Sequence, residues 1–283
     1  MAGQITFPQA DWIGFMHVHF LDPYRPRNSV IHRIDPRIKL VLAVAFILTN
    51  TLLPSGAWPF YILLFALIVS VEVLSDLGVG YVLKRSSLAL PFVLAALPLI
   101  FTIPGIPIFS LPIGPWQIQA SLQGLERFIS ISIKSWLSVQ AAIILAASTS
   151  FPDLLVAMRA LHVPQLLVSV FGLMWRYMFV LVDEASRLLR ARSARSGQSD
   201  QPGIKPGGSI SWRARVTGGM AGSLLLRAFE RSDRIYMAMV SRGYDGEVRS
   251  LPLAKIHLTQ WLVLFAGLAV LVAFLGLAFL VWG

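Results

Sequence analysis

The chain has 283 residues, of which 56% are hydrophobic and only 13% are charged, and its mean hydropathy is +0.70. This composition excludes an ordinary soluble domain and favours an integral membrane protein. The formal net charge of +10 would also suit nucleic-acid binding. In membrane proteins, however, excess Lys and Arg marks cytoplasmic loops, so we expect the lipid bilayer as a partner and no nucleic acid. The absence of cysteine excludes disulfides and cysteine-ligated metal sites.

Two apolar runs near the start of the chain predict the first two transmembrane helices. In "HRIDPRIKLVLAVAFILTNTLLP" (32–54), Asp35 is a candidate N-cap and Pro36 suits the first helical position. A short turn leads to the second run, 58–74, whose aromatic start suits a membrane interface. Both runs approach the length of about 20 residues that crosses a bilayer core as helix.

A third span is expected at about Leu88 to Ile103, after a short basic loop at 84–87. Its prolines, Pro91 and Pro98, predict kinks. The following stretch, "PGIPIFSLPIGPW" (104–116), has four prolines and no charge, so we expect an irregular extracytoplasmic loop.

The fourth span is expected at about Leu122 to Ala147, and the last at Trp261 to Trp282. Lys134 lies within the fourth span, where its side chain either snorkels to the outer interface or faces the bundle interior. Glu72 and Asp76, at the inner end of the second span, are expected at the membrane interface.

The section 150–257 differs in character because it holds most of the basic residues. Its one apolar run near spanning length, 163–182, includes Arg176, which favours a surface-lying or re-entrant helix. We therefore predict three segments: an N-terminal segment with four spans (1–149), a cytoplasmic region (150–257) and a C-terminal span (258–283). This arrangement places every basic loop and the N-terminus in the cytoplasm.

Two amphipathic helices are predicted within 150–257, separated by a linker rich in Gly, Pro and Ser (196–209). The helices end in similar triplets, Ala194-Arg195-Ser196 and Ser241-Arg242-Gly243. In each, a second arginine precedes the final arginine by eight residues and an acid precedes it by twelve: Arg187 and Asp183 in the first helix, Arg234 and Glu230 in the second.

Each of these features has a purely structural explanation when taken singly. An acid four residues before an arginine forms a helix-surface ion pair worth only about 0.2–0.5 kcal/mol. A terminal arginine complements the helix dipole, and Gly243 suits a left-handed C-cap. Capping alone, however, does not require the same triplet twice. Small neighbours leave a guanidinium free to bind a carboxylate in bidentate fashion, so the two ends suit a partner that offers two related grooves.

Apolar residues recur at helical spacing on both helices. Such stripes can pack on another helix or a partner, or rest on anionic lipid. The residues are Trp175, Met178, Phe179, Val182, Ala185 and Leu189 in the first helix, and Leu225, Phe229, Ser232, Tyr236, Met239 and Val240 in the second.

At these residues the sequence resembles the transmembrane (T) component of energy-coupling factor transporters, a branch of the ABC transporters. The resemblance lies in the paired triplets, in "HRIDPRIKL" (32–40) and in the segment 173–196, and it covers nearly the whole chain. The sequence at 32–40 and 173–187 is most similar to that of the cobalt-transport members. Ser196 stands where many members have glycine.

The resemblance implies an all-α integral membrane protein with about five transmembrane helices and two long cytoplasmic amphipathic coupling helices. It implies no enzymatic activity and no cofactor in this chain, because ATP and Mg would be bound by two ABC-type ATPase subunits. A separate membrane subunit would capture the substrate, a micronutrient such as cobalt ion or a vitamin (biotin or a cobalamin precursor). It also implies a location in the bacterial cytoplasmic (inner) membrane. The triplets would bind the ATPase subunits, and Asp183, Arg187, Glu230 and Arg234 would support the coupling helices.

The sequence offers little support for a nucleotide-binding, metal-binding or catalytic site in this chain. The sequence has no G-x-x-x-x-G-K-[ST] phosphate-binding loop. His17 and His19 are close together but lack the further ligands that a metal site needs, so neither a catalytic nor a metal site is expected. Two alternatives remain open: a membrane enzyme acting on lipid or prenyl substrates, which requires a convergent acid or His cluster, and a peripheral lipid-sensing or scaffold protein.

Overall fold

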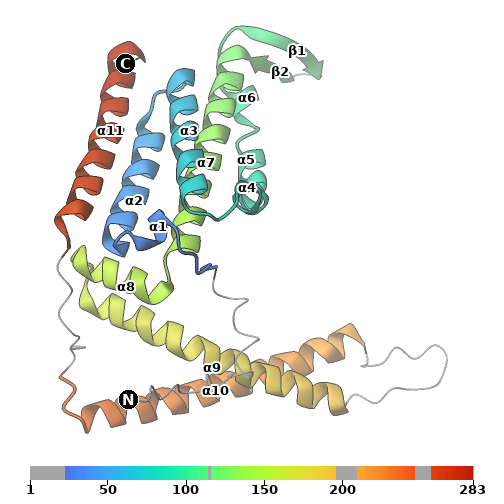
Figure 1. Ribbon diagram of the computed structural model, residues 1–283. Helices are drawn as coiled ribbons and strands as arrows, with labels where there is room; N and C mark the ends of the chain where they lie inside the picture. The colour runs from blue at the N-terminus through green and yellow to red at the C-terminus, as the bar shows by residue number, and fades with distance from the viewer. Residues whose placement is uncertain (1–22, 114–115, 196–208, 246–255, 283) are drawn as a thin grey trace. The chain divides into compact units, whose positions relative to one another are not determined.

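The computed structural model describes residues 23–113, 116–195, 209–245 and 256–282 (Figure 1). The chain divides into two compact units. One, the bundle, consists of Met1–Leu161 and Leu253–Gly283, and the other, the helix-pair unit, consists of His162–Pro252. The division into segments 1–149, 150–257 and 258–283 stays a prediction.

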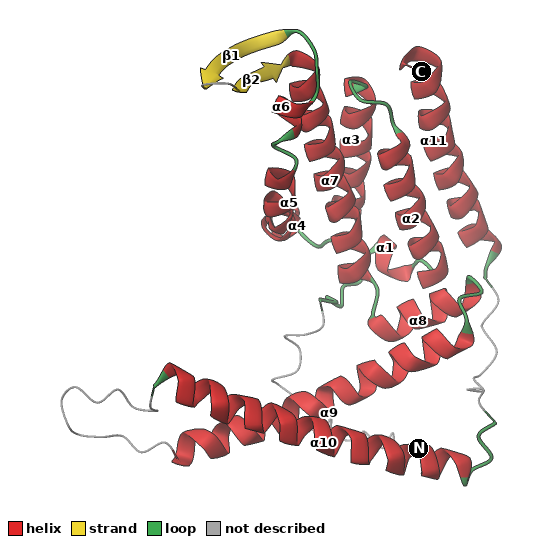
Figure 2. Cartoon of the chain, turned by 180° about the vertical axis from the view of Figure 1, so that it is seen from behind, coloured by secondary structure: helices red, strands yellow, loops and turns green. Residues whose placement is uncertain are grey.

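The bundle is organised around one long helix, α7 (Figures 1 and 2). This helix packs against α2, α3, α4 and α6, while α11 packs against α2. Leu64 of α3 and Leu137 of α7 are completely buried in its core. The helices are α1 (Val30–Arg33), α2 (Pro36–Leu52), α3 (Trp58–Leu74), α4 (Val79–Ser86), α5 (Leu90–Ala95), α6 (Leu99–Thr102), α7 (Leu122–Ser148), α8 (Phe151–Ala160) and α11 (Leu258–Trp282).

The start of α2 is as the sequence predicts. The Asp35 side chain accepts a hydrogen bond from the backbone N–H of Arg37 at 2.9 Å, and Pro36 occupies the first helical position. Because the first N–H groups of a helix have no partner within it, this cap and the proline together fix where α2 begins.

Polar side chains connect α2 and α7 where the two helices pack. The amide nitrogen of Asn50, which is fully buried, donates to the Lys134 carbonyl at 2.7 Å and to the Ser138 hydroxyl at 2.9 Å. The Lys134 ammonium donates in return to the carbonyls of Thr51, at 3.2 Å, and Leu53. Lys134 therefore satisfies the free carbonyls at the end of α2, as basic side chains do at helix C-termini.

The third predicted span differs from its expected form in two ways. It begins at Val79 rather than Leu88, so Lys84 and Arg85 lie in the last turn of α4 and not in a loop. It is also divided into α4, a short 3-10 segment (Ser87–Ala89), α5 and α6. The predicted breaks at Pro91 and Pro98 are confirmed, because each proline lies at the start of one of the short helices.

The expectation of an irregular loop at 104–116 was wrong. Strands β1 (Pro107–Ile113) and β2 (Trp116–Ser121) form an antiparallel hairpin in which Leu111 pairs with Ile118 (Figure 2). The prolines suggested a loop, but each strand of a two-stranded sheet is an edge strand, where proline is tolerated. Ser121 joins the hairpin to α7: its hydroxyl donates to the Ile103 carbonyl at 2.6 Å and accepts from the Gly124 N–H at 3.0 Å.

Apart from this hairpin the described elements are helical, and the protein is an all-α, multi-pass membrane protein. By length and apolar composition, four described segments can cross a bilayer: Val79–Thr102, Leu122–Ser148, Gln165–Arg195 and Leu258–Trp282. Trp58–Leu74 is apolar but shorter. This set includes Gln165–Arg195, for which a surface-lying or re-entrant helix was expected. The segment is apolar enough to be included because most of its charged residues lie in its second half. Its surface position stays a prediction.

Glu72 is buried in the packed end of α3, where it is 1% exposed. Its expected position at the membrane interface stays a prediction.

The helix-pair unit consists of α9 (Gln165–Arg195) and α10 (Ile210–Val240). The two helices cross each other (Figures 1 and 2). Of the linker predicted at 196–209, residues 196–208 lie outside the described part of the chain, and Ser209 caps α10 by accepting a hydrogen bond from the Trp212 N–H at 3.3 Å. The prediction of two amphipathic helices interrupted near this linker is thus confirmed.

Candidate functional site

The end of α10 has the C-cap geometry that the sequence predicts. Gly243 has φ +83°, a left-handed conformation that side chains rarely adopt. The Tyr244 N–H donates to the Met239 carbonyl at 3.1 Å, and the Gly243 N–H donates to the Val240 carbonyl at 2.9 Å. This pair of bonds is a Schellman motif, which closes the helix and satisfies its last carbonyls. Arg242 lies just before the glycine, and its side chain is exposed.

The end of α9 carries the other triplet. Arg195 is the last residue of the helix, and both Ala194 and Arg195 are exposed. Ser196 lies outside the described residues. One turn earlier, Arg192 donates to the hydroxyl of Thr217 on α10 at 2.8 Å. The two arginines at this helix end therefore differ: Arg192 connects the two helices, while Arg195 is exposed.

The two predicted surface ion pairs have different outcomes. Asp183 and Arg187 form an ion pair on the surface of α9. The equivalent residues of α10, Glu230 and Arg234, are both exposed but form no salt bridge with each other. Because exposed pairs of this kind contribute little, the two helices do not depend on them.

A stronger polar contact, which the sequence did not indicate, holds the helices together. Glu184 of α9 accepts from Arg227 of α10 at 3.1 Å through one carboxylate oxygen and from Arg231 at 3.2 Å through the other. The Glu184 side chain is only 17% exposed. Arg227 and Arg231 are four residues apart, so they lie on one face of α10. The four-residue spacing of the two arginines can be seen in the sequence, but it does not indicate which helix they contact.

Next to this contact, α9 and α10 leave an apolar groove between them. It has a volume of about 580 Å³ and is lined by residues with apolar or aromatic side chains. Four residues of the predicted stripes line it: Met178, Val182, Ala185 and Leu225. Other predicted members lie on open surface instead. Phe229 is 61% exposed and Tyr236 is 54% exposed. Exposed apolar patches of this kind mark surfaces that contact another protein or a membrane.

No cluster of three or more metal-ligating side chains occurs in the described ranges. His17 and His19, considered above as a weak metal pair, fall outside those ranges.

The profile of a family described as "Cobalt transport protein" matches residues 27–252, which include both helix ends. The chain is 27% identical to the energy-coupling factor transporter transmembrane protein EcfT of Thermosediminibacter oceani over 244 residues, covering 84% of this chain and 88% of that protein. It is 28% identical to the protein of the same name from Lactococcus lactis, covering 79% and 83% of the two chains. It is also 29% identical to the cobalt transport protein CbiQ of Rhodobacter capsulatus, covering 66% and 71%. All three relatives are named as transport components.

Proposed function

Since this chain belongs to the cobalt transport protein family, we propose that it is the transmembrane T component of an energy-coupling factor transporter. In this role it transmits the conformational change of ATPase subunits to a membrane subunit that captures the substrate. The observation that carries the proposal is the pair of exposed arginines, Arg195 and Arg242, at the ends of two crossing helices. The relatives named for energy-coupling factor transport support the same assignment.

Two ABC-type ATPase subunits are the proposed partners of the helix ends, and they bind the ATP and Mg. Each guanidinium enters an acidic groove on one ATPase subunit and binds a carboxylate there. Three other arginines of the helix pair, Arg192, Arg227 and Arg231, are occupied by contacts between α9 and α10. Arg195 and Arg242 form no ion pair among the described residues, which leaves their charge available to a partner.

Coupling requires that a movement at the end of α9 is transmitted to the end of α10. The Glu184 contact joins α9 and α10 at their crossing, so the pair can move as one body when the ATPase subunits close. A packed element with two discrete positions is the usual basis of such coupling. The groove and the exposed aromatic residues of α10 offer the surface on which the substrate-capture subunit packs.

The proposed location is the bacterial cytoplasmic membrane, with the N-terminus and residues 150–257 in the cytoplasm. The substrate is a micronutrient, either cobalt ion or a vitamin. It contacts the capture subunit, so this chain needs neither a catalytic centre nor a cofactor of its own.

The test is assembly after removal of the two guanidinium groups. Truncating one partner of a buried charge pair in an interface costs roughly 2–5 kcal/mol, or about thirtyfold or more in affinity. We expect Arg195→Ala and Arg242→Ala each to weaken retention of the ATPase subunits during purification from membranes, and the double variant to abolish it. Transport should fall in parallel.

Matched controls lie eight residues earlier on the same helices. Arg187→Ala removes only an exposed ion pair, and Arg234→Ala removes a residue without one, so both should assemble like the unmodified protein. If the double variant retains its ATPase subunits and transports normally, the helix ends are only caps and the proposal fails.

A further inference from the structure

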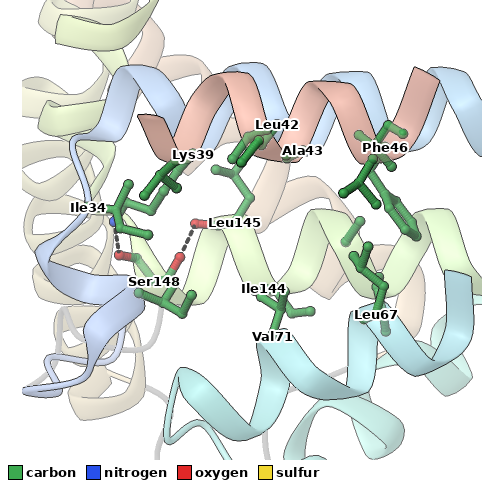
Figure 3. Close-up of a pocket in the computed structure, with 18 residues that line it drawn as sticks. Ile34, Lys39, Leu42, Ala43, Phe46, Leu67, Val71, Ile144, Leu145 and Ser148 are labelled. Carbon is green, nitrogen blue, oxygen red and sulfur yellow. Dashed lines mark hydrogen bonds between the residues drawn. The ribbon is translucent and has the colours of Figure 1, made fainter. Parts of the chain in front are cut away.

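The bundle contains an elongated apolar cavity that the proposed coupling function does not use. Its volume is about 410 Å³, and its walls come from α2, α3, α7 and α11, with α1 at one end (Figure 3). On α2 the lining residues Lys39, Ala43 and Phe46 follow one another at spacings of four and three residues, so they form a single face about two turns long. Ser148, the last residue of α7, lies at the same end of the cavity as Lys39.

Small residues on α11 and its neighbour keep the cavity open. Ala266 and Gly267 face it from α11, and Ala43 faces it from α2. A Cβ added at Gly267 would lie 2.7 Å from a terminal methyl of Leu42 on α2, so the glycine leaves room for this leucine side chain against α11. Val263 and Val270, which also line the cavity, are 42% and 41% exposed. The cavity therefore reaches the outer, bilayer-facing surface of α11.

One end of this apolar space carries a buried positive charge. The Lys39 side chain is 9% exposed, and its ammonium donates to the Ser148 carbonyl at 2.8 Å. An ammonium has three N–H donors, so this contact uses one of them. Lys39 forms no salt bridge with any described residue, although the carboxylates of Asp35 and Asp153 lie near enough to interact with its charge. Burying a cation is costly unless its donors are satisfied, and the remaining donors can bind a further acceptor at the end of the cavity.

The lining restricts the candidate occupants. Apart from Lys39 and Ser148, every residue that lines the cavity is apolar, so the main part of the space suits a flexible hydrocarbon chain. Basic pockets between transmembrane helices on the cytoplasmic side are suited to anionic lipid headgroups.

We propose that this cavity binds one acyl chain of an anionic phospholipid, with the headgroup phosphate accepting hydrogen bonds from Lys39. The lipid fills the space between α2, α3 and α11 and pairs the buried ammonium. The bound molecule thereby becomes part of the bundle, and its binding does not depend on the ATPase partners.

The experiment measures lipid retention by native mass spectrometry of the full-length protein, exchanged into mild detergent with phosphatidylglycerol or with phosphatidylcholine of the same acyl chains. We expect one phosphatidylglycerol molecule to stay bound per chain at detergent levels that remove the other lipids. Lys39→Met keeps the length of the side chain and removes its charge, so phosphatidylglycerol should bind about fivefold more weakly. Lys84→Met, which removes an exposed charge outside the cavity, should have no effect.

A second pair of variants tests the cavity itself. Ala266→Phe places a ring into the space, while Ala269→Phe makes the same change on an exposed position of α11 that does not line it. Retained lipid should disappear in the first variant and persist in the second. Equal retention in both would mean that the lipid belongs only to the general shell around the protein, and equal retention of the two lipids by the unmodified protein would remove the role of Lys39. Either result overturns the proposal. The comparison of the two lipids uses the unmodified protein, so it does not depend on the folding of a variant.

Discussion

The bundle and the helix pair differ in where their apolar side chains lie. In the bundle, helices enclose a core that includes Leu64, Leu137 and Leu271. In the described part of the helix-pair unit, Val168 is the one hydrophobic residue that is buried. The bundle also exposes apolar side chains, such as Ile62 (68%) and Leu280 (83%), but it encloses a core of its own, whereas the described part of α9 and α10 buries almost none. The buried core stabilises the bundle, and we propose that the exposed apolar faces of α9 and α10 bind a partner.

The two units also use polar contacts differently. In the bundle, the Asn50 side chain of α2 donates to the Lys134 carbonyl of α7, and the Lys134 ammonium donates to backbone carbonyls at the end of α2, so these hydrogen bonds fix where the two helices meet. In the helix pair, Glu184 binds two side chains, Arg227 and Arg231, across the crossing. The backbone contacts hold neighbouring helices of the bundle together, and the Glu184 contact holds α9 to α10. This agrees with a helix pair that moves as one body.

The largest expected effect compares one buried leucine with one exposed leucine. Leu64→Ala leaves a cavity in the centre of the bundle and should destabilise the purified chain by about 2–5 kcal/mol. Leu225 is 58% exposed on α10, so Leu225→Ala should lower the free energy of unfolding by less than about 1 kcal/mol. Unfolding in mixed micelles of increasing denaturing-detergent content measures both.

The order of the two effects should be reversed when assembly with the membrane partner is measured in place of stability. Leu225 lines the groove of the helix pair, so Leu225→Ala should weaken association with the membrane partner, while the folded fraction of Leu64→Ala should bind normally. If Leu225→Ala leaves association unchanged, the groove is not the surface that the partner covers.

The next effect concerns the crossing of α9 and α10. Glu184→Gln removes the negative charge that both arginines share, so the angle between the helices should become less well defined. Asp183→Asn, at the adjacent residue, removes only an exposed pair within α9 and is the matched control. Nitroxide labels at Arg190→Cys and Arg234→Cys, possible because the chain has no cysteine, report the distance distribution. A distribution of equal width in both variants would show that Glu184 does not hold the crossing.

Local chemistry explains which features could be predicted from the sequence. Asp35, Pro36 and Gly243 determine helix ends through bonds to residues within a few positions, and all three behave as expected. The Glu184 contact was missed because it joins residues 43 and 47 positions apart, and nothing local shows which helices will be neighbours. The buried position of Glu72 depends on the same long-range packing.

The β-hairpin was missed for a different reason. Prolines at 107 and 112 argue against a strand in the interior of a sheet, but not against an edge strand. The roles of Arg195 and Arg242 were inferred from their repeated setting. Their exposure agrees with that inference, but their binding to ATPase subunits stays a prediction because it concerns surfaces of other chains.

The smallest expected effect distinguishes the cap of α10 from its proposed binding role. Gly243→Ala forces a side chain into the left-handed conformation, at a cost of about 1 kcal/mol. An added Cβ would meet no other atom within 4 Å, so the cost arises from the backbone alone. The last turn should open about fivefold more often, which hydrogen exchange at the Gly243 and Tyr244 amides can measure. Gly243→Asn should cost less, because asparagine tolerates this conformation.

If both variants raise exchange as expected yet bind the ATPase subunits like the unmodified chain, the guanidinium of Arg242 is sufficient without a rigid cap. If binding falls in proportion to exchange, the glycine contributes by holding Arg242 in position.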